Sequence, residues 1–296
     1  MNETRSSTAP SFMVVAAASL WGLFWLPLRA FESAGLEAGW ATLAQFVVPA
    51  VLLTPLALCR VSRGRATGLG EIWTGLLVGS AFVLYFESLL LTEVVRALLL
   101  FYITPIWGTL LEVTFMRRRL TGVRAIALLL GLSGFCVILG FETGVPMPRN
   151  LGDAMALVAG VTFAIGTLRV RQRTQVPVFE QLFSFFIYGG LLAGLLVLLP
   201  TDEMGAPPSV AVMTVLAPWL VLMAAAFLIP VMWVLLWGSK ALNPGKLGIL
   251  LQMEAVVGIG SAALFAREPF GFREVSGTVL VVSAALVDTL NQRQTH

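Results

Sequence analysis

Long apolar segments recur along the whole chain and constrain its fold more than any other feature. Each has about 18 to 23 mostly apolar residues, which is the length that a helix needs to cross the hydrocarbon core of a bilayer. Polar or Pro/Gly-containing breaks separate them. The sequence therefore predicts ten membrane-spanning helices, at residues 12–31, 38–59, 72–91, 94–114, 122–141, 151–171, 179–199, 212–237, 246–265 and 273–291.

The composition agrees with a membrane location. Of the 296 residues, 58% are hydrophobic and only 12% are charged, and the mean hydropathy is +0.90. A soluble globular domain has about a quarter of its residues charged, so this chain would have too little polar surface to cover itself in water. We expect an all-α polytopic membrane protein whose surroundings are the lipid bilayer.

Several classes of function lack the residues that they need. The net charge is only +3 and no block of five like charges occurs, which argues against a nucleic-acid partner. Cys59 and Cys136 fall in different predicted helices, and the one histidine is His296. This inventory predicts no metal site, no cofactor and no disulfide framework. The N-terminal apolar segment lacks a small-x-small cleavage site, so we expect no cleaved signal peptide.

Basic residues are unevenly distributed between the two sets of predicted loops. One set, with the helix ends beside it, holds 14 of the 19 Lys and Arg residues: Arg5, Arg60, Arg63, Arg65, Arg117, Arg118, Arg119, Arg124, Arg169, Arg171, Arg173, Lys240, Lys246 and Arg293. The other set holds Arg29, Arg96, Arg149, Arg267 and Arg273. Because cytoplasmic loops of membrane proteins retain Lys and Arg, both termini are predicted to be cytoplasmic.

The chain also has a weak internal repeat. Shifting the sequence by about 150 residues places "VRALLLFYITPIWGTLLEVTFMRRRL" over "GKLGILLQMEAVVGIGSAALFAREPF", so that Arg96 meets Lys246 and Gly108 meets Gly258. We therefore divide the chain into two five-helix repeats, 1–146 and 147–296. Since five is odd, the second repeat enters the membrane from the opposite side, which is the inverted-repeat architecture of many secondary transporters.

These residues resemble a known family. The segments "SLWGLFWLPLR", "YFESLLL", "FYITPIWGTLLE" and "LLQMEAVVGIGSAALFAREPFGFREVSGTVLVV" are similar to EamA-type drug/metabolite transporters, and most similar to aromatic amino-acid exporters of the YddG type. The resemblance implies ten helices in two inverted repeats and export of a small molecule. Family members commonly have Glu-Pro where this chain has Glu254-Ala255, a departure that argues against a proline kink at this position.

Glu254 is the sharpest candidate for a substrate-binding residue. It lies at the centre of the ninth predicted helix, where a charged group costs about 2.5 to 3.5 kcal/mol on insertion scales. It is interpreted as a proton carrier or as the partner of a substrate ammonium group. The alternative is a protonated structural acid that bonds to a neighbouring helix, for example through Gln252, which we include among the candidates.

Glu87 and several aromatic residues complete the candidate set. Glu87 could neutralise a substrate amino group, extend toward the interface, or pair with Arg96. Rings with a polar edge suit an apolar or aromatic substrate, and they also pack well inside a protein. The candidates for lining a cavity are Tyr85, Tyr102, Phe163 and Trp233; Tyr85, Tyr102 and Trp233 match positions that line the cavity in YddG-type exporters, as the resemblance implies.

Glycine and proline inside the predicted helices have structural interpretations. "GLLVG" at 75–79 and "GLLAG" at 190–194 allow helices to approach closely. Pro27, Pro49, Pro105 and Pro230 are candidates for kinks. "GLSG" at 131–134 has the form of an intramembrane serine protease motif, but no internal histidine is present to activate Ser133, so catalytic residues are not expected.

The sequence is thus interpreted as that of a secondary transporter and not of an enzyme. We expect export of amino acids, chiefly aromatic and other apolar ones, or of related metabolites across a bacterial inner membrane by alternating access. Nucleotide-sugar or multidrug transport is the alternative within the fold, and a channel or an intramembrane enzyme is the alternative outside it. The partners expected are a small-molecule substrate and lipid, with the protein as a monomer, and both facilitative and proton-coupled transport stay open.

Overall fold

The computed structural model describes residues 8–114, 122–139, 148–172, 175–199, 204–242, 244–266 and 271–294, and within these ranges the protein is helical and contains no strand. The helices of the first half are α2 (Thr8–Gly22), α3 (Trp25–Ser33), α4 (Ala38–Ser62), α5 (Ile72–Leu91), α6 (Val94–Phe101), α7 (Thr104–Thr114) and α8 (Gly122–Leu139). Those of the second half are α9 (Leu151–Gln172), α10 (Val178–Val197), α11 (Val210–Met223), η2 (Ala224–Leu228), α12 (Ile229–Ala241), α13 (Pro244–Ser261), η3 (Ala262–Ala266) and α14 (Phe272–Gln294).

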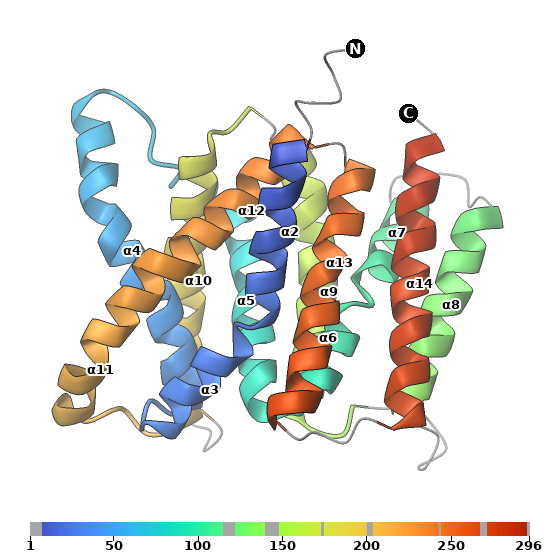
Figure 1. The fold of residues 1–296 in the computed structure, drawn as a ribbon. Coiled ribbons are helices and arrows are strands. Elements are labelled where there is room, and N and C mark those ends of the chain that lie inside the picture. Colours follow the sequence, from blue (N-terminus) through green and yellow to red (C-terminus); the bar gives the residue numbers. More distant parts are fainter. Residues whose placement is uncertain are drawn as a thin grey trace.

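The helices run up and down through an elongated bundle (Figure 1). The start of α2 and the end of α14 lie at the same end of the bundle, which we call the terminal end, and the other is the far end. Among the described residues, six helices are long and apolar enough to cross a membrane, and four shorter apolar helices accompany them. Helices occupy every segment where the sequence predicts one. The number of crossings, ten, stays a prediction.

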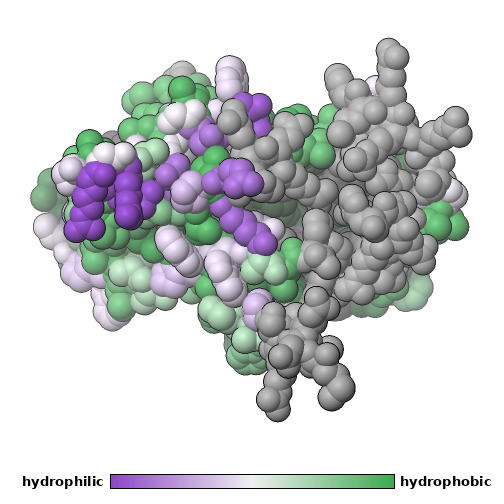
Figure 2. All heavy atoms as spheres, turned by 90° about the horizontal axis from the view of Figure 1, so that it is seen from above, coloured by the Kyte–Doolittle hydropathy of each residue, from purple (hydrophilic) through white to green (hydrophobic). Residues whose placement is uncertain are grey.

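Hydrophobic side chains cover much of the outside, as a bilayer requires. Leu58, Trp73, Val215 and Leu264 are each more than half exposed. Figure 2, a view onto the terminal end, shows hydrophilic residues gathered over the side where α4 ends, with hydrophobic residues around the described rim. This distribution is expected of helices whose sides face lipid and whose ends face water.

Two of the predicted helices are each divided into two segments. After α2, the N–H groups of Leu23 and Phe24 bond to carbonyls three residues back instead of four, and α3 then begins. Between α6 and α7, the N–H of Ile103 likewise bonds to the carbonyl of Leu100 at 3.4 Å.

The positions of these divisions have a common cause. Proline lacks an N–H and its ring clashes with the carbonyl four residues earlier, which weakens the preceding turn. Pro27 lies four residues after Leu23 and Pro105 two residues after Ile103, the first residue with a weakened bond in each break. Pro230 follows the π-helical turn η2 by two residues. Pro49 lies inside α4, which continues past it to Ser62. Three of the four predicted kink positions thus lie at an irregularity.

Small residues allow the central helices to approach closely. A Cβ on Gly79 would lie 2.8 Å from the backbone nitrogen of Gly189 on α10, and one on Gly75 would lie 2.3 Å from the Ser184 hydroxyl. The "GLLVG" segment therefore packs α5 against α10, as predicted. In "GLLAG", a Cβ on Gly190 would make only ordinary contacts, at 3.6 Å or more from its neighbours.

Candidate functional site

A polar cluster surrounds Glu254 where α5, α6 and α13 meet. The hydroxyl of Tyr85 on α5 donates a hydrogen bond to Glu254 Oε1 at 3.1 Å. The hydroxyl of Tyr102, at the break between α6 and α7, donates to the Leu251 carbonyl at 3.4 Å and lies beside the Glu254 side chain. Two phenols and a carboxyl from three separate segments thus form what we call the Glu254 cluster.

Tyr102 lies directly before the break. Its N–H still bonds to the carbonyl of Leu98, four residues back, whereas Ile103 bonds three residues back and a new helix begins at Thr104. The Thr104 hydroxyl donates to the carbonyl of Phe101 at 2.6 Å, which satisfies one acceptor left by the break. Gly160 on α9 lies against the same turn, because a Cβ there would be 3.1 Å from the Phe101 carbonyl.

The break after α2 lies against the same part of α13. A Cβ on Gly22 would lie 2.5 Å from the backbone oxygen of Glu254 and 2.9 Å from the nitrogen of Gly258. One turn further, Trp25 Nε1 donates to the hydroxyl of Ser261 at 2.9 Å, and this bond is buried. These contacts with α2 and α3 therefore fix the position of α13 along its own axis, and with it the position of Glu254. α13 itself is continuous through Ala255, as expected from the missing proline.

Aromatic rings form one wall of the cluster. Tyr85 stacks on Phe101 with ring centroids 4.5 Å apart. Phe163 on α9 contacts Phe101 at 5.4 Å and Phe82 at 5.7 Å. Phe101 was not among the sequence candidates; its place next to Tyr102, directly before the break, is the signal that could have identified it.

The other predicted residues occupy different surroundings. Gln252 lies on α13 two residues before Glu254, and its amide oxygen is buried without a hydrogen-bond partner in the described part of the chain. Trp233 on α12 is 41% exposed. Glu87 is fully buried, about one turn before the end of α5 at Leu91. The structure thus brings together Tyr85, Tyr102, Phe163 and Glu254, while Glu87 and Trp233 have no contact with Glu254 among the interactions that the described residues show.

Arg96 pairs with an acid that the sequence did not suggest for it. Arg96 at the start of α6 and Asp153 at the start of α9 form a buried ion pair. The Thr92 hydroxyl also donates to Asp153, at 2.9 Å, as does the Arg149 backbone N–H. This network joins α6 to α9 at the far end of the bundle.

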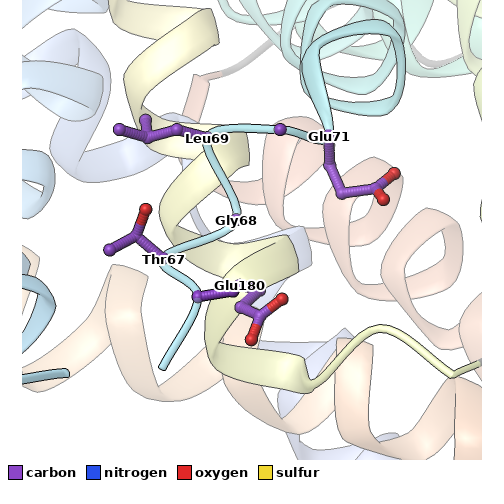
Figure 3. A pocket seen from close by; sticks show the side chains of 7 residues that line it. Thr67, Gly68, Leu69, Glu71 and Glu180 are labelled. Atoms are coloured by element: carbon purple, nitrogen blue, oxygen red, sulfur yellow. The ribbon is translucent and has the colours of Figure 1, made fainter. Parts of the chain in front are cut away.

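A surface pocket lies elsewhere, at the terminal end. It has a volume of about 420 Å³ and is lined by residues 66–71 and by Glu180. Figure 3 shows the loop passing the first turns of α10, with the Glu71 and Glu180 carboxylates beside it. Glu180 binds Arg60 at 3.1 Å. None of the Glu254 cluster lines this pocket, so we take the cluster and not the pocket as the candidate substrate site, because the cluster supplies convergent polar groups at helix breaks deep in the bundle.

Comparison with known proteins supports a transport role. Residues 9–140 match the EamA-like transporter family. A crystal structure described only as "Crystal structure of protein" is similar over 98% of this chain and 99% of its own, with a TM-score of 0.58 and 19% sequence identity. No curated protein matches the chain.

Each comparison carries a different conclusion. The family match makes the first half of the chain similar to membrane transporters of the drug/metabolite type, which are not enzymes. The structural match, at 19% identity, shows that nearly the whole chain shares its fold with a protein solved by crystallography. Together with the apolar helices, the family match supports a multi-pass membrane protein that moves a small molecule.

Proposed function

We propose that this protein exports amino acids, chiefly aromatic and other apolar ones, or closely related metabolites, and that the Glu254 cluster binds them. The single observation that carries this proposal is the convergence of Tyr85, Tyr102 and Glu254 at a helix break. A carboxylate can bind a substrate ammonium group, the phenol hydroxyls can bind its polar atoms, and the wall of Phe101 and Phe163 can contact an apolar side chain.

The helix packing supports two inverted five-helix repeats, 1–146 and 147–296. In the second half, α9 packs on α5 and on α6 and α7; in the first half, α2 packs on α12 and α13 in the same way. Exchanging the halves converts one set of contacts into the other. In the pairs α4–α10, α6–α13 and α8–α14, the two helices occupy corresponding places in the two halves, so the exchange leaves each pair unchanged. The family match ends at residue 140, close to the proposed boundary.

This arrangement suggests alternating access. In inverted-repeat transporters, the site lies between the repeats near the middle of the membrane and is built from discontinuous helices. Here Tyr85 and Tyr102 belong to the first repeat and Glu254 to the second, so that movement of one repeat against the other changes their separation. We place the protein in a bacterial inner membrane, as a monomer with both termini in the cytoplasm.

Counterflow in proteoliposomes tests the function. Purified protein is reconstituted into liposomes loaded with an unlabelled compound, and uptake of the same labelled compound is followed for phenylalanine, leucine, a nucleotide sugar and a quaternary organic cation. Counterflow of phenylalanine above empty liposomes, with little for the other two classes, supports the proposal. Selective counterflow of the nucleotide sugar or the cation contradicts it in favour of the alternative substrates. Flux that does not saturate with concentration indicates a channel.

A further inference from the structure

A second buried acid lies on the face of α5 that turns away from the Glu254 cluster. Glu87 has no exposed surface, and neither of its carboxyl oxygens has a hydrogen-bond partner in the described ranges. It follows Tyr85 by two residues, which places the two side chains on roughly opposite faces of the helix. Glu87 therefore belongs to a different environment from the proposed substrate site.

The neighbouring helix α4 turns polar side chains into the same buried region. Thr42 lies beside Glu87, is itself fully buried, and its hydroxyl has no hydrogen-bond partner among the described residues. Gln45, one turn further along α4, is 2% exposed, and its amide nitrogen likewise has none. Buried polar atoms that are left unpaired are rare in folded proteins, so such a group calls for an explanation.

No cation is bonded to Glu87 in the part of the chain that the structure describes. On α3, Arg29 donates to the backbone carbonyls of Leu89 at 3.0 Å and Thr92 at 2.8 Å, and Glu32 is the other charged residue of this helix. Because Glu32 is also an acid, it makes an ionised Glu87 less favourable.

The remaining helices packed on α5 hold their charges in other pairs, except for Arg169 and Arg171 of α9, which lie at the end of α9 opposite to Asp153. On α6 and α9, Arg96 and Asp153 bind each other. On α10, Glu180 binds Arg60 of α4. This ion pair lies near the first residues of α5 and α10, whereas Glu87 lies near the last residues of α5. An ionised carboxylate without a cation is very costly in an apolar interior, and the single neutral hydroxyl of Thr42 offsets only part of that cost, so the group takes up a proton instead.

We propose that Glu87 is a proton-binding residue of the transport cycle, protonated in this conformation and facing Thr42. Protonated, the neutral carboxyl can donate its O–H to the Thr42 hydroxyl oxygen. When α5 moves and water reaches the residue, the O–H bond breaks, the proton passes to water, and the carboxylate remains until a proton from the other side restores it. One proton then crosses in the direction opposite to one exported substrate.

A proton suits this site better than a metal cation. Hard cations such as Ca²⁺ bind six or more oxygen ligands, and Mg²⁺ also requires six. Glu87 and Thr42 together offer three side-chain oxygens. The proposal rests on the proposed transport function, and it assigns the two acids different roles: Glu254 binds substrate, whereas Glu87 carries the proton.

Infrared spectroscopy tests the protonation without relying on transport. A protonated carboxyl has a C=O stretching band that a carboxylate and an amide lack. The parent protein and the Glu87→Gln variant are compared in lipid at neutral pH, with Glu32→Gln as the matched control from the adjacent helix. Loss of a protonated-carboxyl band in Glu87→Gln and not in Glu32→Gln supports the proposal. No such loss overturns it. Glu87→Asp, whose band should persist, provides a second variant if Glu87→Gln does not fold.

Transport under an imposed pH gradient tests the role in the cycle. With one proton exchanged per substrate, one pH unit should change phenylalanine accumulation about tenfold in the parent. Glu87→Gln should retain counterflow but lose this gradient dependence. Equal gradient dependence in both proteins, or its absence from the parent, overturns the carrier role and leaves the proposed export intact. Dependence on a Na⁺ gradient overturns it in favour of a metal ion. Absence of counterflow for every compound contradicts the proposed function and, with it, the carrier role. The infrared comparison still shows in that case whether Glu87 is protonated.

Discussion

The Tyr85 hydroxyl donates a hydrogen bond to the Glu254 carboxylate, at 3.1 Å, across 169 positions of the sequence. This contact joins α5 in the first half of the chain to α13 in the second. It supplies a donor to an acid that would otherwise be poorly solvated between apolar helices. A transporter that alternates between two states must change contacts between its halves, and this one lies at the proposed substrate site.

Removing the Tyr85 hydroxyl should weaken both binding and stability. In Tyr85→Phe the ring can still stack on Phe101, but Glu254 loses a donor, which costs about 1 to 3 kcal/mol for a buried group. We expect a lower midpoint of thermal unfolding in detergent and a higher half-saturating phenylalanine concentration. Tyr188→Phe is the control, because the Tyr188 hydroxyl bonds to the Leu69 carbonyl at the terminal end. Equal effects of the two changes on transport would contradict a role for Tyr85 at the site.

The contact between Gly22 and α13 predicts a sharp difference between two glycines. In Gly22→Ala the new Cβ would lie 2.5 Å from the Glu254 carbonyl oxygen, so that α2 and α13 must separate. Overpacking of this kind costs about 1 to 3 kcal/mol. Gly260→Ala, on α13, meets nothing within 4 Å and should be neutral or stabilising by up to about 1 kcal/mol. Thermal unfolding and counterflow of both variants measure the difference; similar behaviour would mean that this contact does not hold the site in place.

Labelling with a membrane-impermeant thiol reagent should reveal the sidedness. Cys59 and Cys136 are first replaced by Ser. Single cysteines are then introduced at four exposed positions: Glu93, Gly271, Arg63 and Lys240. Glu93 and Gly271 lie at the far end and should react in intact cells, whereas Arg63 and Lys240 should react only after permeabilisation. Reaction of the Lys240 position from outside would reject the predicted orientation and the inverted repeat together.

The positions of the helices were predictable because length and hydropathy decide them locally. The segment predicted at 72–91 is α5, Ile72–Leu91, and that predicted at 151–171 is α9, Leu151–Gln172. In a bilayer, backbone groups must bond within their own helix, so a sufficiently long apolar run leaves few alternatives. The two breaks were harder to predict, because a proline only weakens the preceding turn and packing decides whether it opens; α4 contains Pro49 and Pro55 without a break.

Partners distant in sequence could not be predicted from the same information. Glu254 is conspicuous alone, as a carboxyl at the centre of an apolar helix, but nothing local indicates that Tyr85 faces it. Nothing in the local sequence marks Asp153, at the start of α9, as the buried partner of Arg96 that the structure shows. That ion pair also removes Arg96 as the obvious partner of Glu87, and this depends on how α5, α6 and α9 pack against one another.

Glu254→Gln should weaken recognition of the substrate ammonium group while leaving the fold almost unchanged. The amide keeps the shape of the acid and can still accept from Tyr85, so folding should change little. It has no charge to attract an ammonium group, and loss of a charge-assisted hydrogen bond of about 1.5 to 3 kcal/mol weakens binding by roughly ten- to hundredfold.

The substrate series for this variant is chosen by charge. Competition against labelled phenylalanine counterflow is measured for phenylalanine, phenethylamine, which keeps the ammonium group, and phenylpropionate, which lacks it. In the parent, phenethylamine should compete better than phenylpropionate, and Glu254→Gln should remove that preference. Glu87→Gln is the matched control and should keep it, because Glu87 lies on the opposite face of α5 from the Tyr85–Glu254 contact. If Glu254→Gln keeps the parent's preference, the ammonium group is recognised elsewhere and Glu254 is a structural acid.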